Sequence, residues 1–209
     1  MQHFAPEAGQ EFNFFVEKLP TWTGWLATVV VDETGTTIGP DGTSKSLGNH
    51  TDLQLLLALR SKSSVIVTTE RTARAEKYVA SRFAPIAIIT RNPTSLADIP
   101  AVSKPGAHPL VTLTSNNAIE ASFMSFTEQL EQAGYQRFLF EGGVISLRAL
   151  VASGLPVTLV LSIANVTLPR SPNFQDLLDQ LLGTKAALAI TEAYSVGNNI
   201  VSVWSRPQS

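Results

Sequence analysis

Residues 138–147 read FLFEGGVISL, an apolar run, two glycines and a second apolar run. Its apolar beginning is typical of a buried strand, and an apolar helix follows the two glycines. Gly142 and Gly143 let the backbone turn tightly and approach a ligand without a Cβ clash. Free N–H groups at a helix start attract phosphate. Two interpretations stay open on these residues alone: a phosphate-binding turn, or a tight connection between a strand and a helix.

Strands and helices alternate on both sides of this stretch. The expected strands cover residues 25–31, 64–69, 85–90, 109–114, 137–140, 157–163, 185–194 and 199–205. The expected helices cover residues 50–61, 72–78, 117–133, 143–153 and 174–182. The alternation predicts an α/β fold with a mainly parallel, mixed sheet, and the last two strands predict a C-terminal antiparallel hairpin. Residues 1–20 show no regular pattern and read as an irregular N-terminal arm of a single domain spanning 1–209.

The composition excludes several classes of protein. A formal net charge of -2 over 209 residues offers no basic surface for nucleic acid or for a membrane. There are no cysteines, and the three histidines are far apart, so no metal site is expected. The first residues lack the pattern of a secretory signal, which makes the cytoplasm the expected location. The expected partner is therefore a small molecule.

Two further strand ends carry polar groups. The segment 68–78 reads TTERTARAEKY and places Arg71 and Thr72 at a strand-to-helix junction, where both can bind phosphate. Thr90 and Arg91 follow the next strand. An arginine at either junction suits the extra phosphate of NADPH better than the bare ribose of NADH. Each junction alone also fits a solvated surface arginine beside an N-cap threonine, but the three junctions together favour a dinucleotide.

One long loop and several absent motifs narrow the function further. Residues 35–48 read GTTIGPDGTSKSLG, a segment too rich in Gly, Ser and Thr to pack, and such loops are usually functional or mobile. The sequence contains no GxGxxG, GxxxxGK[ST], GxSxG or EF-hand pattern. Rossmann-type, P-loop, α/β-hydrolase and calcium-binding sites are therefore disfavoured.

These motifs resemble a known family, the C-terminal reductase domain of bacterial riboflavin-biosynthesis deaminase-reductases, within the dihydrofolate-reductase-like superfamily. The resemblance covers residues 25–165. It is carried by DGTS at 41–44, LG at 47–48, the helix 52–60, TARAE at 72–76 and FEGG at 140–143. It implies a three-layer αβα domain that reduces a pyrimidine nucleotide-type substrate with NADPH, as 5-amino-6-(5-phosphoribosylamino)uracil reductase does. Hydride transfer depends chiefly on positioning two carbons, so neither a nucleophile nor a metal is required.

The resemblance also assigns roles to residues. The expected cofactor-binding residues are Thr69, Arg71, Thr72, Thr90, Arg91, Gly142, Gly143 and Val144. The expected substrate residues are Thr28, Asp41, Ser44, Gly48 and Arg74. The expected catalytic residues are Glu76 and Glu141. The loop 41–48 would close over the nicotinamide. Family members are commonly homodimers, and the terminal hairpin offers edge strands that a second subunit can cover.

Several positions depart from the family pattern. Thr34 stands where many members have an aspartate, and Thr28 where a lysine or asparagine is frequent. Thr69 and Arg71 replace glycines before the phosphate-site threonine, and residues 157–158 replace an Asp-Glu pair. Two functions therefore stay open. One is an NADPH-dependent reductase, and the other is a catalytically idle relative that binds a nucleotide or dimerises in a regulatory or structural role.

Overall fold

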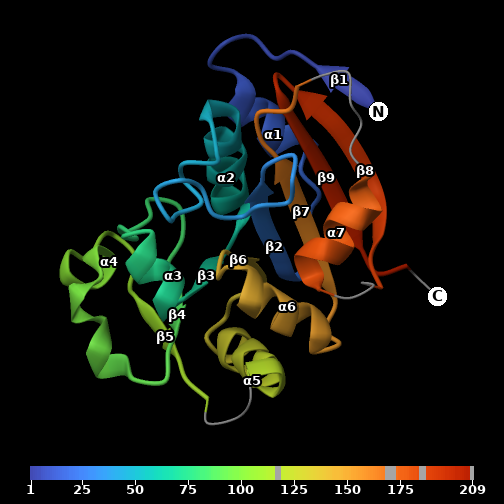
Figure 1. The fold of residues 1–209 in the computed structure, drawn as a ribbon. Coiled ribbons are helices and arrows are strands. Elements are labelled where there is room, and N and C mark those ends of the chain that lie inside the picture. Colours follow the sequence, from blue (N-terminus) through green and yellow to red (C-terminus); the bar gives the residue numbers. More distant parts are fainter. Residues whose placement is uncertain (116–118, 168–172, 184–186, 208–209) are drawn as a thin grey trace.

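The sheet is mixed and mainly parallel, as the sequence predicts (Figure 1). The computed structural model describes residues 1–115, 119–167, 173–183 and 187–207, and within them nine strands form one sheet in the order β1-β8-β9-β7-β2-β6-β3-β4-β5. The strands are β1 (Gln2–Phe4), β2 (Gly24–Val31), β3 (Val65–Thr69), β4 (Ile86–Ile89), β5 (Val111–Leu113), β6 (Arg137–Phe140), β7 (Val157–Ile163), β8 (Ala189–Val196) and β9 (Asn199–Ser205). β9 is antiparallel to both β7 and β8, which confirms the C-terminal hairpin.

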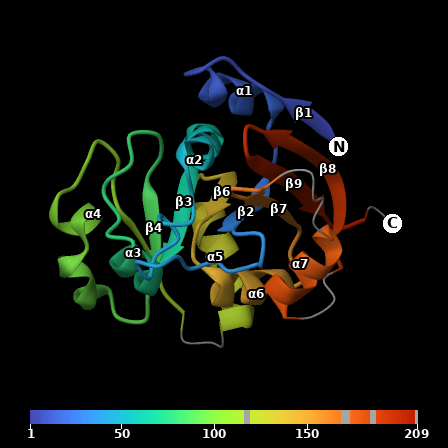
Figure 2. The ribbon, with the colours of Figure 1, turned by 45° about the horizontal axis from the view of Figure 1, so that its top comes forward.

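Helices cover both faces of the sheet and so make three layers (Figure 2). They are α1 (Glu11–Lys18), α2 (His50–Lys62), α3 (Glu70–Ala75), α4 (Pro100–Ser103), α5 (Ile119–Gln132), α6 (Val144–Ala152), α7 (Phe174–Leu182) and the 3₁₀ helix η1 (Pro93–Asp98). Apolar residues of α1, α2 and α3 pack on one face, and those of α5, α6 and α7 pack on the other. In the described parts of the chain, no helix is both long enough and apolar enough to cross a membrane.

The position of β2 in the middle of the sheet explains why its sequence is apolar almost throughout. Side chains of a strand alternate between the two faces, so Leu26 contacts the α2 side of the core while Trp25 contacts the α5 side. The Trp25 ring is edge-on to Phe138, with centroids 5.2 Å apart, and its Nε1 donates to Thr127 Oγ1 at 2.9 Å. That hydrogen bond satisfies the indole N–H, which burial removes from water.

The expectation of an irregular arm over residues 1–20 is wrong, because this segment contains β1 and α1. β1 pairs in parallel with β8, and α1 buries Phe15 completely. The rings of Phe4, Phe14 and Tyr194 contact one another and join β1, α1 and β8. A three-residue strand is too short to show the alternation of apolar and polar residues that predicts a strand. Pairing with β8 stabilises β1. β1 thereby covers part of the hairpin edge that the sequence left available for a second subunit.

Other element boundaries differ by a few residues from the expected ones. α3 begins at Glu70 rather than at residue 72, because Thr69 is its N-cap. The connection between β4 and β5 contains η1 and α4, which are too short to show a helical period in the sequence. The expected helix start at residue 117 and the expected strand start at residue 185 lie outside the described residues.

Candidate functional site

The turn between β6 and α6 presents backbone at the carboxyl-terminal edge of the sheet. Gly143 has a φ of +81°, which favours glycine. It is the N-cap of α6, and it has no side chain that could accept a hydrogen bond from the first N–H groups of the helix. The first N–H groups of a helix have no intrahelical acceptor and attract anions. A Cβ on Gly142 would lie 2.4 Å from Phe140 Cζ, and one on Gly143 would lie 3.1 Å from Thr72 Oγ1. The turn therefore requires glycine at both positions.

Two threonines of the β3–α3 junction meet this turn. Thr72 Oγ1 donates to the Gly142 carbonyl at 2.9 Å, and Thr69 Oγ1 accepts from Thr72 N at 3.2 Å. Because β3 and β6 are parallel neighbours, their carboxyl ends lie side by side. The structure thus brings Thr69, Thr72 and the two glycines together, and Val144 follows as the first residue of α6.

The carboxylate of Glu141, beside the turn, accepts hydrogen bonds from other side chains of the protein. It accepts from Arg60 Nε at 2.9 Å, from Arg60 Nη2 at 2.6 Å and from the Tyr78 hydroxyl at 2.6 Å. Its side chain is only 5% exposed. Burial, and then the charge of Glu141, raises the pKa of Tyr78 well above its usual value, so the phenol remains a donor. These contacts connect α2, the segment after α3 and the diglycine turn, and they engage both oxygens of Glu141.

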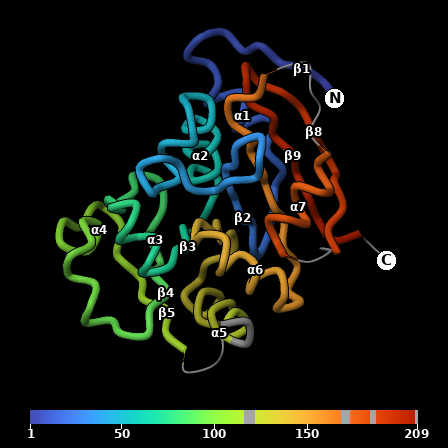
Figure 3. The backbone as a smooth tube through the Cα atoms, in the orientation of Figure 1, coloured from blue at the N-terminus to red at the C-terminus, as the bar shows by residue number. Residues whose placement is uncertain are grey.

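Glu76, the other expected catalytic residue, contacts the loop between β2 and α2, drawn in light blue in Figure 3. Glu76 Oε1 accepts from Ser44 N at 2.7 Å and from Ser44 Oγ at 2.9 Å, and its backbone carbonyl accepts from Lys45 Nζ. Asp41 stays within the loop, where hydrogen bonds, that from Ser46 first, lower the pKa of its carboxyl. The structure therefore brings Ser44 to Glu76, whereas Asp41 shapes the loop itself.

Asp52 lies against the end of the same loop, a position that its place in the sequence did not reveal. A Cβ on Gly48 would lie 2.7 Å from Asp52 Oδ2, so Gly48 lets the loop approach the first turn of α2. Burial raises the pKa of the Asp52 carboxyl to about 6. Thr28 shares the α2 side of the sheet with Leu26, two residues earlier on β2. An aspartate in a first helical turn usually complements the helix dipole, so its place in the sequence gives no sign that the Asp52 carboxyl is shielded from water.

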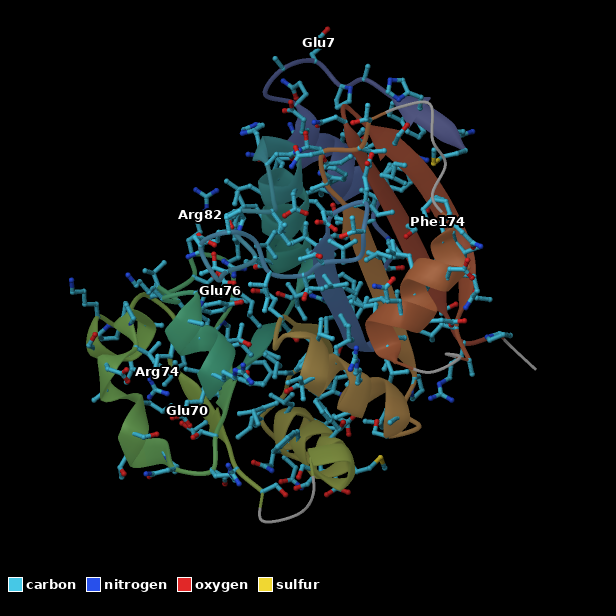
Figure 4. The ribbon with its side chains drawn as sticks, viewed as in Figure 1. Glu7, Glu70, Arg74, Glu76, Arg82 and Phe174 are labelled. Atoms are coloured by element: carbon cyan, nitrogen blue, oxygen red, sulfur yellow. The ribbon has the colours of Figure 1, made fainter. Side chains whose placement is uncertain are left out.

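Arg74, expected beside the substrate, contacts η1 instead of the loop (Figure 4). Its Nε and Nη2 donate to the Asp98 carboxylate at 2.6 Å and 2.9 Å, and its Nη1 donates to Glu70 Oε1 at 2.9 Å. Glu70 also accepts from Ser95 Oγ at 2.7 Å and from the hydroxyl of Thr90. Arg74 and Thr90 thus belong to one network at the end of β4, away from Ser44.

Arg71 and Arg91, the two expected phosphate-binding arginines, are exposed. Within the described residues, neither has a hydrogen-bond or ion-pair partner for its side chain. Arg71 precedes Thr72 in α3, and Arg91 follows the end of β4 by two residues. Both therefore lie at the edge of the sheet where parallel sheets bind ligands, and both are available to a phosphate.

Comparison with known proteins identifies the fold. No family model and no curated protein matches the sequence. The structure is similar to a pyrimidine reductase-like protein of Corynebacterium diphtheriae, with a TM-score of 0.66, 17% identity and coverage of 95% of this chain and 99% of that chain. It is similar to a diaminohydroxyphosphoribosylaminopyrimidine deaminase/5-amino-6-(5-phosphoribosylamino)uracil reductase of Thermotoga maritima, with a TM-score of 0.64, 11% identity and coverage of 88% of this chain and 57% of that chain. It is also similar to the dihydrofolate reductase of Enterococcus faecalis complexed with NADP(H), with a TM-score of 0.51, 12% identity and coverage of 88% and 97%.

These likenesses show that the chain has the dihydrofolate-reductase-like fold. The expectation of a three-layer αβα arrangement with a mainly parallel sheet is thereby confirmed. Structural likeness at identities of 11–17% establishes the fold but not the substrate, because one fold supports many activities.

Proposed function

We propose that this protein is a reductase that uses a nicotinamide dinucleotide, with NADPH the form that the sequence predicts. Its proposed substrate is of the pyrimidine nucleotide type, such as 5-amino-6-(5-phosphoribosylamino)uracil. The observation that carries the proposal is the meeting of Thr69 and Thr72 with the diglycine turn at the start of α6. Backbone donors, a hydroxyl and the absence of a Cβ are the features that a diphosphate needs. A bound reduced nicotinamide would supply the hydride.

The charges around the turn fit a dinucleotide diphosphate. The hydroxyl of Thr72 can rotate from the Gly142 carbonyl toward a phosphate oxygen without movement of the backbone. Arg71, next in the chain to Thr72, supplies an exposed positive charge. Arg60 neutralises Glu141 through a buried ion pair, so the carboxylate beside the turn does not oppose an anion.

The loop between β2 and α2 fits a small polar substrate. Within the described residues, Glu76 accepts hydrogen bonds from Ser44 through Oε1, which leaves Oε2 for a substrate donor. Asp52, with a pKa of about 6, is mostly protonated below about pH 6 and lies against Gly48 at the loop end. Groups of this kind orient a ring that carries N–H donors and a sugar, and orientation is the main requirement of hydride transfer.

Two contacts favour the second candidate, a catalytically idle relative that binds a nucleotide. Thr34 replaces an aspartate of the family, and its Oγ1 donates to Asp32 Oδ1 at 2.7 Å within its own turn. Glu141 is bonded at both oxygens to Arg60 and Tyr78. Internal contacts therefore engage one expected catalytic residue, Glu141, and one position, Thr34, at which many family members have an aspartate.

Binding and turnover separate the two candidates. Purified protein is titrated with NADPH and with NADH while the fluorescence of the reduced nicotinamide is followed. Oxidation of each dinucleotide is then measured with the ribosylaminopyrimidine as acceptor. Oxidation supports the reductase, binding without oxidation supports the idle relative, and failure of both dinucleotides to bind overturns the proposed site.

A matched pair of variants connects binding to the turn. Thr72→Val removes the hydroxyl and keeps the shape, so we expect binding to weaken about tenfold through the loss of one hydrogen bond to a charged group. Thr112→Val makes the same change at an exposed position of β5 and leaves binding unchanged. Equal effects of the two variants would contradict the proposed position of the diphosphate.

A further inference from the structure

A carboxylate of the protein occupies an anion site at the end of β4. Glu70, the first residue of α3, accepts from the hydroxyl of Thr90, from Ser95 Oγ at 2.7 Å and from Arg74 Nη1 at 2.9 Å. The donors come from the residue after β4, from η1 and from α3. Thr90 is 4% exposed, so its hydroxyl is inside the protein. Two hydroxyls and a guanidinium are donors that suit a phosphate, and here they bind a side chain of the protein.

This anion site lies one strand away from the diglycine turn. Thr72 and the turn lie at the ends of β3 and β6, whereas Glu70 joins the end of β3 to the end of β4 through Thr90. Neighbouring strands are roughly 4.8 Å apart. The loop that contains Ser44 starts from β2, on the other side of β6. A dinucleotide with its diphosphate at the turn and its nicotinamide toward β2 therefore extends its adenosine ribose toward Glu70.

We propose that Glu70 makes this protein prefer NADH to NADPH, an inference that rests on the proposed function. The two dinucleotides differ only in the phosphate on the adenosine ribose. An acidic residue at the end of a strand accepts hydrogen bonds from free ribose hydroxyls, whereas it repels a phosphate at the same place.

The donors around Glu70 are already bonded. The single hydroxyl proton of Thr90 goes to Glu70, and the Thr90 oxygen accepts from Asn92 N at 3.0 Å. Arg74 is shared between Glu70 and Asp98. Hydrogen bonds, that from Thr90 first, lower the pKa of Glu70, so its carboxylate is ionised at neutral pH. The Glu70 carboxylate would therefore repel a phosphate on the ribose. The donors nearby would not be free to bind that phosphate, because they already donate to Glu70.

Arg71 and Arg91 are the groups that oppose this preference. Both are exposed, where water and salt weaken the field of a charge. The side chain of Glu70 is 24% exposed and is held in place by three donors. Because a fixed and partly buried charge acts more strongly on a neighbouring group than a mobile exposed one, Glu70 decides the preference.

The test measures the dissociation constants of NADH and NADPH for the intact protein by fluorescence titration at neutral pH and low salt. We expect wild-type protein to bind NADH at least about tenfold more tightly. Glu70→Gln removes the charge and keeps the shape, so its affinity for NADPH rises about tenfold while its affinity for NADH stays the same or falls. Glu131→Gln removes the same charge from the exposed end of α5 and leaves both constants unchanged.

Each outcome decides the inference. Equal affinities, or tighter binding of NADPH by wild-type protein, overturn the role of Glu70 and leave the proposed reductase standing. Failure of both dinucleotides to bind overturns the proposed function and the inference with it. The comparison of the two dinucleotides needs only wild-type protein, so it does not depend on the folding of any variant.

Discussion

Thr72 Oγ1 donates to the carbonyl oxygen of Gly142 at 2.9 Å across 70 positions of the chain. The contact exists because β3 and β6 run in parallel side by side, so the residues that follow them meet at one edge of the sheet. It joins the start of α3 to the start of α6, the two places where a dinucleotide is expected to bind.

Gly142→Ala tests whether this meeting point tolerates any side chain. The added Cβ would lie 2.4 Å from Phe140 Cζ, and Phe140 is 1% exposed and unable to move freely. We expect a loss of about 1–3 kcal/mol in the free energy of unfolding, the range for overpacking, together with weaker dinucleotide binding. Urea denaturation and fluorescence titration measure the two effects. Unchanged stability and binding would show that the turn moves without cost.

Glu141→Ala tests the buried ion pair. The change leaves the guanidinium of Arg60 and the hydroxyl of Tyr78 without their acceptor, so we expect about 3 kcal/mol of destabilisation in urea. Glu192→Ala is the control, because it breaks an exposed pair with Lys18, in which the side chains are 32% and 41% exposed, and costs less than about 1 kcal/mol. Similar losses in the two variants would contradict the structural role of Glu141.

Asp52→Asn tests the raised pKa of that carboxyl. In the unfolded chain an aspartate ionises near its usual pKa, whereas folded Asp52 keeps its proton until about pH 6. The folded protein therefore binds more protons between these values, and Asp52 lowers stability as pH rises from about 4 to about 6. A shift of about two pKa units corresponds to roughly 3 kcal/mol as an upper bound.

The measurement is urea denaturation of wild type and Asp52→Asn from acidic to neutral pH. The variant should gain stability relative to wild type above about pH 6 and show no gain near pH 4. Asp176→Asn provides the control, since Asp176 occupies the same place in the first turn of α7 and is exposed. A gain that does not depend on pH would contradict the burial of Asp52.

Glu76→Gln tests how the loop between β2 and α2 is held. Glu76 Oε1 accepts from both the backbone N–H and the hydroxyl of Ser44, so loss of its charge weakens two hydrogen bonds. We expect faster amide hydrogen exchange in residues 41–48 with a change of less than about 1 kcal/mol in global stability, because loops open locally. Glu128→Gln, on the exposed side of α5, should leave exchange in the loop unchanged. Protection equal to wild type in Glu76→Gln would mean that other contacts hold the loop.

Much of the fold could be predicted from local patterns. Period and length predicted the buried strands, turn residues predicted the hairpin, and FEGG predicted a tight turn from a strand into a helix. β1 and α1 could not be predicted in this way, because β8 and the ring of Tyr194 stabilise them from the far end of the chain.

Part of the candidate site could also be predicted from the sequence. Thr72 and the two glycines were expected at one site, and the structure brings them into contact. Arg74 was expected beside Glu76, yet its guanidinium binds Asp98 and Glu70. The spacing of residues in the sequence does not reveal the direction of a long side chain, because that direction depends on which acceptors other elements place within its reach.

From its residues alone, FLFEGGVISL is expected to run from a buried strand through a glycine turn into a helix, because an apolar run, two glycines and a second apolar run follow one another. The surroundings of this turn depend on the tertiary structure. It placed Arg60 on Glu141, Glu70 among the donors at the end of β4, and Asp52 against the loop. The reason is that the charge and the pKa of a group depend on neighbours that are close in space and distant in sequence.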